Sequence, residues 1–471
     1  MENIFNPQSV ALIGATDRRG SVGFGIAKNL LFGKSQRKIF FVNPSKKKIL
    51  NQKTVASILD IKQKIDLAVI AVPSRFVKGV ILECVQANVG SCIIISSGFA
   101  ELSKEGAILQ KEIAELLREN NIPLVGPNCL GVINPTAKLN ASFAPETPKP
   151  GAIAFLSQSG ALIDSIIDKS LLENFGFSLV VSYGNEAGLC LNDFLKIASV
   201  DENTKVIAIY LEEIKNGQEF IKIASEVTKR KPITILKGGK TKIGKKAVQS
   251  HTASLAGDEK IYSAAFKKAN IIEVETIEDL FLTSQVLSIY SKNKNGWPLS
   301  NAPHSDADWL AQTPAGNEAG WAILTNGGAV GVITADWCSR FCVKMANIPK
   351  AVFEEIEQSK KINLSFTRNN PLDIIGDASS EGYSVALRAL LKQEKIKGVI
   401  FCQTLQTMTN PIENAKIIIE AQNQFKDKPI LALFLGGKIT QKGVEFLKKN
   451  QCVVFTEPRD IALMASIVSN F

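Results

Sequence analysis

Histidine and long apolar segments are scarce in this sequence. Only two of the 471 residues are histidines, His251 and His304. No stretch approaches the roughly 18 consecutive apolar residues that a membrane span needs, so we expect no membrane-embedded segment. The first residues, MENIFNPQSVALIGA, lack the basic and apolar regions of a secretory signal, and this favours a cytoplasmic protein.

Patterns for disulfides, metal binding and nucleic-acid binding are also missing. The eight cysteines are scattered, mostly inside apolar runs, as is typical of reduced core residues. Cys338 and Cys342 have no second pair of Cys or His nearby, so no metal site is expected. The net charge of +10 comes from lysines spread along the chain, without interleaved aromatic residues. It is explained by a small polyanionic ligand or by solubility alone, and we expect no nucleic-acid partner.

Short β-branched runs alternate with helical stretches along most of the chain, which predicts parallel α/β sheets. The first series comprises SVALIGA, KIFFVNP, IDLAVIAVP, SCIIISSGF and IPLVGPN. The second comprises AIAFLSQSG, SLVVSYGNEAG, VIAIYLEEI, PITILKGGK and NIIEVE, and the third comprises WAILTNGGAVGV, GVIFCQTL, KPILALFLGGK and CVVFTEP. We therefore expect three doubly wound domains, at residues 1–147, 148–290 and 321–471.

One phrase occurs in both later series, and a linker separates them. KPITILKGGK and KPILALFLGGK resemble each other, so domains two and three are expected to share a topology. Residues 291–320 are rich in Asn, Asp, Ser, Pro and Gly without periodicity, which predicts a linker. His304, Trp297, Trp309 and, at the end, Trp321 lie in or beside it. These aromatic residues either pack onto a neighbouring domain or contact a partner.

A glycine-rich turn, IGATDRRGSVGFG, follows the first predicted strand and leads into a helix. It contains Gly14, Gly20 and Gly23. Glycine there lets backbone N–H groups approach a phosphate, and the helix dipole favours the anion. The spacing is not G-x-G-x-x-G, and the second strand ends without an acidic ribose ligand, in Asn43, Pro44 and Lys46. A nucleotide with an extra phosphate, such as coenzyme A, suits this site better than NAD. A tight turn without a ligand is the alternative.

The second series repeats the strand–turn–helix arrangement in FLSQSGALIDSII. Ser157, Ser159 and Gly160 lie at the predicted helix start. The serines are either helix N-caps or, with the free N–H groups of the first turn, ligands of a phosphoryl group.

The last candidate site residues are a glutamate and a histidine. The strand VIAIYLEEI ends in Glu212 and Glu213, of which at most one faces a given site because strand side chains alternate. A carboxylate that accepts one imidazole N–H leaves the other nitrogen free to attack, as a phosphoryl-carrying histidine requires. His251, in SHTASLAG, is such a candidate; a loop histidine held by hydrogen bonds is the alternative.

Ten motifs in order resemble the NDP-forming acyl-CoA synthetases, and among them the α subunits of ADP-forming acetate–CoA ligases. They are NIFNPQSVALIGATDRRGSVG, VNPSK, VPSRFV, SSGFAE, GPNCLGVINP, SQSGAL, YLEEIKNG, SHTASLAG, TNGGAVGV and NPLDIIGD. The resemblance implies a Rossmann-like CoA-binding domain followed by two flavodoxin-like ligase domains, the first of which carries the phosphohistidine. Succinate–CoA ligase α subunits resemble only the first two domains.

The resemblance also implies three reactions. Phosphate splits a CoA thioester to give an acyl phosphate, the phosphoryl group passes to a histidine, and the phosphohistidine phosphorylates ADP. His251 corresponds to the carrier and Glu212 to the glutamate of the family's YLEG motif, whose glycine is replaced here by Glu213. Ser157, Ser159 and Gly160 are expected to bind phosphate. The residues expected to bind coenzyme A are Gly14, Ala15, Thr16, Gly20, Val22, Gly23, Asn43, Pro44, Lys46, Val72, Pro73, Ser97, Gly98 and Asn128.

The remaining expectations concern partners and alternatives. No segment is left for an ATP-grasp domain, so a separate ATP-grasp β subunit that binds ADP or ATP with Mg²⁺ is the expected partner, in an α2β2 assembly. The substrate is expected to be a small carboxylic acid or its CoA thioester, acetate first. A non-catalytic CoA-binding regulator and a nicotinamide oxidoreductase are the competing functions.

Overall fold

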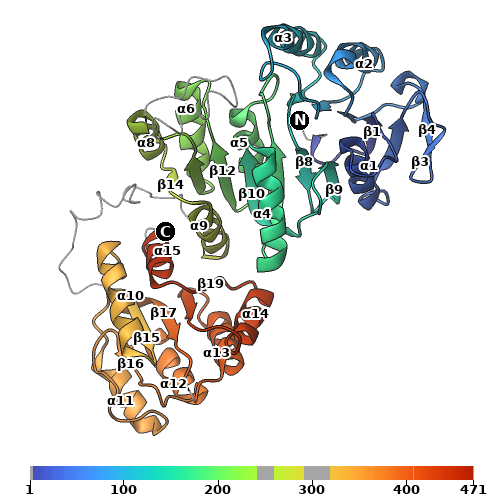
Figure 1. The fold of residues 1–471 in the computed structure, drawn as a ribbon. Coiled ribbons are helices and arrows are strands. Elements are labelled where there is room, and N and C mark those ends of the chain that lie inside the picture. Colours follow the sequence, from blue (N-terminus) through green and yellow to red (C-terminus); the bar gives the residue numbers. More distant parts are fainter. Residues whose placement is uncertain (1–3, 241–258, 291–318, 407, 470–471) are drawn as a thin grey trace. The chain divides into compact units, whose positions relative to one another are not determined.

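The computed structural model divides the chain into two compact units, residues 1–280 and 281–471 (Figure 1). It describes residues 4–240, 259–290, 319–406 and 408–469.

The first sheet of unit 1 has the strand order β3-β4-β2-β1-β5-β6-β7 in the described chain. Its strands are β1 (Ser9–Ile13), β2 (Lys38–Val42), β3 (Lys48–Ile49), β4 (Gln52–Val55), β5 (Leu67–Ile70), β6 (Cys92–Ile94) and β7 (Leu124–Val125). The helices between them are α1 (Val22–Phe32), the 3-10 helix η2 (Ile58–Asp60), α2 (Ser74–Gln86) and α3 (Lys104–Glu119). All neighbours except β3 and β4 pair in parallel. Without β3 this is the Rossmann order, which reverses between β1 and β5.

The second sheet of unit 1 has the order β14-β13-β12-β10-β11-β8-β9. Its strands are β8 (Gly131–Asn134), β9 (Leu139–Ser142), β10 (Pro150–Ser157), β11 (Phe177–Ser182), β12 (Val206–Leu211), β13 (Ile233–Lys237) and β14 (Ile272–Val274). The associated helices are α4 (Gly160–Glu173), α5 (Leu191–Val200), α6 (Gly217–Thr228), α8 (Glu259–Lys268) and α9 (Ile277–Tyr290), which crosses into unit 2. The strands β10 to β14 are parallel in flavodoxin order, with the reversal between β10 and β12.

The β8–β9 hairpin lies within the predicted first domain, residues 1–147, yet it belongs to the second sheet. β8 pairs antiparallel with β11, which makes a sheet mixed where the sequence predicted parallel strands only. The hairpin also packs on α1, where Asn29 Nδ2 donates to the backbone oxygens of Ser142 (2.9 Å) and Ala144 (2.8 Å). It therefore ties the first helix of the chain to the second sheet.

The sheet of unit 2 has the order β16-β15-β17-β18-β19 and is parallel throughout. Its strands are β15 (Gly320–Thr325), β16 (Leu372–Asp373), β17 (Ile396–Gln403), β18 (Ile430–Phe434) and β19 (Val454–Phe455). Its helices are α10 (Gly328–Arg340), α11 (Lys350–Ser359), α12 (Ser380–Leu391), α13 (Pro411–Gln424), α14 (Gln441–Lys449) and α15 (Pro458–Ser469). The order is again flavodoxin-like, so the shared topology expected from KPITILKGGK and KPILALFLGGK is confirmed. Trp321, expected beside the linker, is buried in β15 and donates to Ser469 Oγ at 2.6 Å.

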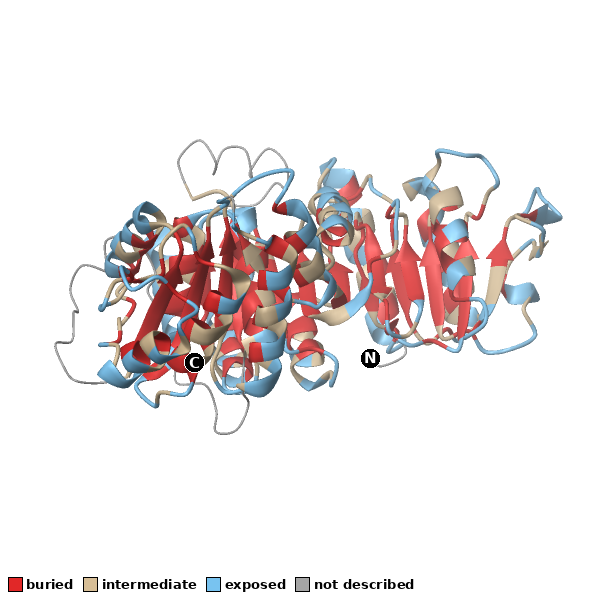
Figure 2. Cartoon of the chain, turned by 90° about the horizontal axis from the view of Figure 1, so that it is seen from below, coloured by how far each residue is buried: buried red, intermediate tan, exposed pale blue. Residues whose placement is uncertain are grey.

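Burial explains why these strands are continuous apolar runs. Every residue of β1 and β11 is buried, because helices cover a parallel sheet on both faces (Figure 2). The helices instead expose one side to solvent. None of the helices in the described ranges is long and apolar enough to cross a membrane.

Candidate active site

The turn after β1 is shaped by close backbone contacts. Gly14 has a φ of +95°, in the left-handed region that glycine tolerates. A Cβ atom at Gly14 would collide with the carbonyl group of Ala71, and one at Gly23 would collide with the Gly14 oxygen. Gly20 also has a positive φ, +76°, but nothing lies within 4 Å of the place a Cβ would take. The turn thus brings β1, the end of β5 and the start of α1 together at the point where the first sheet reverses.

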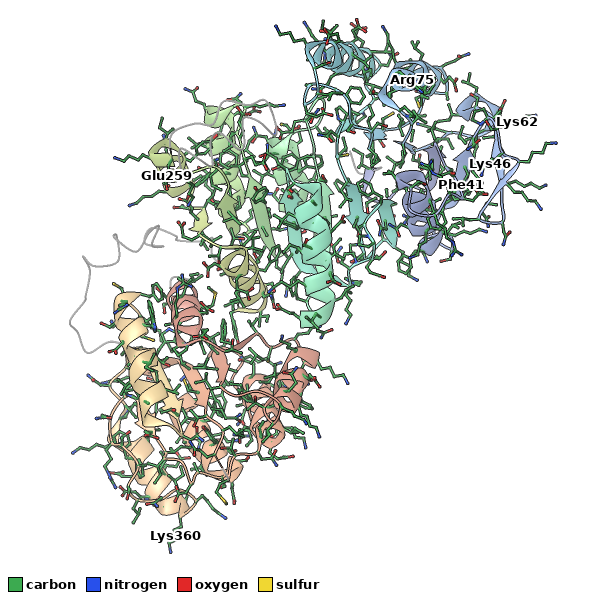
Figure 3. All side chains as sticks on the ribbon, viewed as in Figure 1. Phe41, Lys46, Lys62, Arg75, Glu259 and Lys360 are labelled. Atoms are coloured by element: carbon green, nitrogen blue, oxygen red, sulfur yellow. The ribbon has the colours of Figure 1, made fainter. Side chains whose placement is uncertain are left out.

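The end of β2 offers amide and ammonium groups rather than a carboxylate. Asn43 Nδ2 donates to Ala15 O at 2.9 Å, and its Oδ1 accepts from the N–H groups of Ser45 (2.8 Å) and Lys46 (3.1 Å). Lys46, labelled in Figure 3, forms an ion pair with Asp17 in the glycine turn, and this pair lowers the pKa of Asp17. Both side chains are largely exposed, so an incoming phosphate would compete with Asp17 for the ammonium group.

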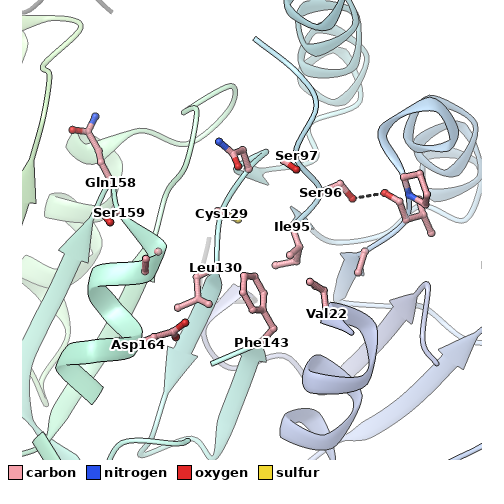
Figure 4. Close-up of a pocket in the computed structure, with 16 residues that line it drawn as sticks. Val22, Ile95, Ser96, Ser97, Cys129, Leu130, Phe143, Gln158, Ser159 and Asp164 are labelled. Carbon is pink, nitrogen blue, oxygen red and sulfur yellow. Dashed lines mark hydrogen bonds between the residues drawn. The ribbon is translucent and has the colours of Figure 1, made fainter. Parts of the chain in front are cut away.

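A cavity of about 550 Å³ joins the carboxyl edge of the first sheet to the N-terminal turn of α4 (Figure 4). Its lining residues are Val22, Ala71, Val72, Pro73, Ile95, Ser96, Ser97, Asn128, Cys129, Leu130, Phe143, Gln158, Ser159, Gly160, Ala161 and Asp164. Those that the sequence predicted as site residues are Val22, Val72, Pro73, Ser97, Asn128, Ser159 and Gly160. The predicted residues that lie outside this lining are Gly14, Ala15, Thr16, Gly20, Gly23, Asn43, Pro44, Lys46, Gly98, Ser157 and Glu212.

Hydrogen bonds fix the part of the lining that follows β5, β6 and β7. Ser96 Oγ donates to Val72 O at 2.5 Å, and the Asn128 N–H donates to Ser96 O at 2.9 Å. Asn128 has a φ of 57°. Gly98 donates its N–H to Glu101 Oε1 at 2.6 Å. The predicted residues Val72, Gly98 and Asn128 therefore share one hydrogen-bonded edge of the first sheet.

The serines after β10 form a hydrogen-bonded turn at the start of α4. The buried Ser157 Oγ accepts the Ser159 N–H (3.0 Å) and donates to Ser159 O (2.8 Å). Ser159 is the N-cap of α4, because its Oγ accepts the Leu162 N–H at 3.3 Å. This role uses its oxygen and not its O–H, so the hydroxyl can still donate to a ligand. A Cβ at Gly160 would lie 3.1 Å from the Leu130 Cβ, so a larger residue there would require Leu130 to move by a few tenths of an ångström.

Gln158, which sequence reasoning did not assign, connects this turn to Glu212. Its Oε1 accepts hydrogen bonds from the backbone N–H groups of Glu212 and of Glu213 (3.0 Å), and its Nε2 donates to Glu213 O at 3.2 Å. The side chain thus spans the reversal point between β10 and β12. The sequence feature that could have indicated Gln158 is its position between Ser157 and Ser159.

Glu212 is the buried member of the glutamate pair. It is 7% exposed, whereas Glu213 is half-buried. The Tyr210 hydroxyl donates to Glu212 Oε1 at 3.3 Å, and burial together with the Glu212 charge raises the pKa of Tyr210 to about 12. The phenol therefore stays protonated and can keep donating to the carboxylate at physiological pH.

Asp164 is a second lining residue that sequence reasoning missed. It lies four residues after Gly160, on the same face of α4. Its Oδ1 atom is shielded from solvent and has no hydrogen-bond partner in the described ranges. Burial raises the pKa of this carboxyl to about 6.

Unit 2 repeats the turn of β10 and α4. Thr325 Oγ1 accepts the Gly327 N–H (3.0 Å) and donates to Gly327 O (3.1 Å), as Ser157 does with Ser159. Asn326 Oδ1 accepts the Thr404 N–H (2.8 Å) and its Nδ2 donates to Thr404 O (3.1 Å), as Gln158 does after β12. In the turn of unit 2, Gly327 is the helix N-cap in place of Ser159, and Thr404 occupies the position equivalent to Glu212.

The proposed phosphoryl carrier lies outside the described residues. His251 falls in 241–258 and His304 in 291–318, so their positions are not part of the structure.

Comparisons with known proteins agree with this domain order. Three family models match the chain, described as CoA binding domain (residues 8–135), Succinyl-CoA ligase like flavodoxin domain (150–287) and Ligase-CoA domain (321–467). The chain is 35% identical over 468 residues to the acetate–CoA ligase [ADP-forming] II α subunit of Pyrococcus furiosus, which covers 99% of this chain and 96% of that subunit. The chain belongs to the ADP-forming acetate–CoA ligase family. The family predicted from the ten motifs is thereby confirmed.

One further relative is longer than this ligase-family chain, and one related solved structure has nearly the same length. Acetate–CoA ligase [ADP-forming] I of Archaeoglobus fulgidus is 36% identical over 471 residues, which are 100% of this chain and 64% of that protein. The solved structure of a dinucleotide-forming acetyl-coenzyme A synthetase 1 from Ca. Korarchaeum cryptofilum, in complex with phosphate and ADP, is 32% identical and superposes with a TM-score of 0.89, covering 100% of this chain and 96% of that one. The expected fold, a Rossmann-like CoA-binding domain followed by flavodoxin-like domains, is confirmed.

Proposed function

We propose that this chain acts as the α subunit of an ADP-forming acyl-CoA ligase, with acetate as the first acyl group to test. The reaction interconverts acyl-CoA, ADP and phosphate with the free acid, CoA and ATP. The observation that carries the proposal is the cavity, because it places the edge of a CoA-binding domain against the Ser159–Gly160 helix start.

In the proposed first step, a phosphate oxygen attacks the thioester carbonyl carbon. The C–S bond breaks and the CoA thiolate leaves, which yields an acyl phosphate. Ser159, Gly160 and the first N–H groups of α4 would hold the phosphoryl group, because a helix N-terminus offers N–H donors and a positive dipole end, and Ser157 would hold the turn in shape. The CoA part would lie against the first sheet, on the fourteen residues that the sequence predicted for it; the open space at Gly20 and the ammonium of Lys46 fit a phosphorylated ligand.

In the second and third steps, His251 carries the phosphoryl group. An imidazole nitrogen attacks phosphorus, the P–O bond to the acyl group breaks and the carboxylate leaves; a terminal phosphate oxygen of ADP then attacks phosphorus, the P–N bond breaks and the neutral imidazole leaves. Glu212 would accept the other imidazole N–H and fix the tautomer. We propose that ADP and Mg²⁺ bind to a separate ATP-grasp β subunit, in an α2β2 assembly.

A labelling experiment tests the function. The purified chain, mixed with its ATP-grasp partner and γ-labelled ATP, should acquire phosphate that is acid-labile and alkali-stable. His251→Ala should abolish the label, and His304→Ala, which removes the other histidine, should leave it. An unlabelled chain in the presence of an active partner would favour a CoA-binding regulator instead.

A further inference from the structure

Asp164 lines the cavity, and one oxygen of its carboxyl group, Oδ1, is shielded from solvent. Its Oδ1 atom has no hydrogen-bond partner in the described ranges, although burying an unpaired charged oxygen costs free energy. Burial raises the pKa of the carboxyl to about 6, so at pH 7.5 the group is mostly ionised and accepts hydrogen bonds only. A ligand in the cavity that carries a hydrogen-bond donor would pair with this carboxyl group.

The fold itself does not require an acid at this position. The repeated turn in unit 2 starts α10 at Gly328 as α4 starts at Gly160, and its fourth following residue is Val332 rather than an aspartate. The same strand, turn and helix therefore form with an apolar residue there. The presence of an aspartate at position 164 is therefore explained by a ligand that binds in unit 1 and not by the fold.

The surroundings of Asp164 suit an acyl chain. Asp164 lies about 6 Å along the helix axis, just over one helical turn, beyond Gly160, where the proposed function places the phosphoryl group. Figure 4 shows its carboxyl group directed toward Leu130 and Phe143, with Val22 beyond them. A short acyl chain attached at the Ser159–Gly160 end would run along these apolar side chains and end near the carboxylate.

We propose that Asp164 is a specificity residue that accepts a hydrogen bond from a hydroxyl or ammonium group on the acyl chain. The inference rests on the proposed function, because that function places the thioester at this end of the cavity. Unsubstituted acyl groups leave the carboxylate unpaired. Acyl groups that end in a carboxylate are repelled, because none of the described lining residues is a lysine or arginine.

Four thioesters of nearly equal size test the proposal by calorimetric binding to the full chain. They are propionyl-CoA, 3-hydroxypropionyl-CoA, β-alanyl-CoA and malonyl-CoA, measured at pH 7.5 in phosphate-free buffer so that no thioester is split. We expect the hydroxyl and ammonium compounds to bind at least about tenfold more tightly than propionyl-CoA, as one hydrogen bond to a charged group allows, and malonyl-CoA to bind more weakly.

Variants of Asp164 distinguish recognition of the acyl group from binding of CoA itself. Asp164→Asn and Asp164→Leu should remove the preference, and Asp164→Leu should bind propionyl-CoA at least as tightly as the unchanged chain. Asp168→Asn, at an exposed aspartate one turn further along α4, should keep the preference. Free CoA should bind equally to all of these chains.

Three results would overturn the inference. Equal affinities for the four thioesters would show that Asp164 does not read the acyl group, while the proposed ligase function would stand. A loss of free CoA affinity in Asp164→Asn that equals the loss for 3-hydroxypropionyl-CoA would assign the carboxylate to the pantetheine arm. Absence of binding for CoA and every thioester would contradict the proposed function itself.

Discussion

The side chain of Gln158 positions the backbone of Glu212, because Gln158 Oε1 accepts a hydrogen bond from the Glu212 N–H. The two residues follow β10 and β12, the strands on either side of the reversal point in the second sheet. The contact therefore couples the turn proposed to bind phosphate to the carboxylate proposed to orient His251.

Removing this contact should loosen the turn after β12. In Gln158→Ala, the N–H groups of Glu212 and Glu213 should exchange with solvent at least about tenfold faster, since a lost hydrogen bond of about 1.4 kcal/mol has that effect. Hydrogen exchange resolved by mass spectrometry measures this, and labelling of His251 should decline in parallel. Asn326→Ala is the matched control and should accelerate exchange at Thr404 instead. Unchanged exchange at Glu212 in Gln158→Ala would show that the contact contributes nothing.

Two glycines of the first turn should differ in their tolerance of alanine. Gly14→Ala combines a positive φ with a collision against the Ala71 carbonyl, so we expect a loss of about 3 kcal/mol or more in the unfolding free energy. Gly20→Ala has only the left-handed backbone cost of about 1 kcal/mol, because the space there is open. Urea unfolding of the two variants measures the difference. Equal losses would contradict the close approach of β1 and β5.

Lys46 should contribute to CoA affinity through a phosphate. Lys46→Gln is expected to weaken CoA binding about two- to fivefold, as for one exposed charged contact, and to leave dephospho-CoA affected less. Lys48→Gln, at an exposed lysine that begins β3, serves as the control and should bind both ligands normally. If Lys46→Gln lowers the two affinities equally, Lys46 does not contact the additional phosphate.

Asp164 should make stability depend on pH in a defined direction. Burial raises its pKa to about 6, above the roughly 3.9 of an unfolded aspartate, so the folded chain binds the proton more tightly. The cost of the ionised carboxyl is absent below pH 4, develops between pH 4 and 6, and persists above that range. Asp164→Asn should therefore gain stability relative to the unchanged chain as the pH rises through this window. Parallel unfolding curves for the two chains would contradict the shielding of Asp164.

The sheets were predictable where the chain buries both faces of a strand. β1 and β11 are continuous apolar runs bounded by turn residues, so the sequence alone located them. The two-residue strand β16 and the β3–β4 hairpin have too few apolar residues to form a pattern. The assignment of the β8–β9 hairpin to the second sheet depends on pairing with β11, a long-range contact that no local period encodes.

The site was predictable where local geometry demands a residue type. The glycine turn after β1 and the serines before α4 follow from backbone approach and helix capping. Gln158 was not assigned because its partners lie 54 and 55 residues away in sequence. Helical spacing could have placed Asp164 on the same face of α4 as Gly160. It could not have indicated that the carboxyl group is shielded, because the shielding comes from the packing around the cavity.

Comparison of the two repeated turns distinguishes the residues that shape the backbone from those proposed to contact a ligand. Units 1 and 2 both use a hydroxyl residue and an amide residue to shape the bend, Ser157 with Gln158 and Thr325 with Asn326. They differ at the helix N-cap, Ser159 against Gly327, and at the fifth residue of the helix, Asp164 against Val332, where we propose that unit 1 contacts its ligand. The octapeptides SQSGALID and TNGGAVGV thus share a bend that their first two residues shape, and an engineer who wishes to alter what unit 1 binds can change Ser159 and Asp164 while leaving Ser157 and Gln158 untouched.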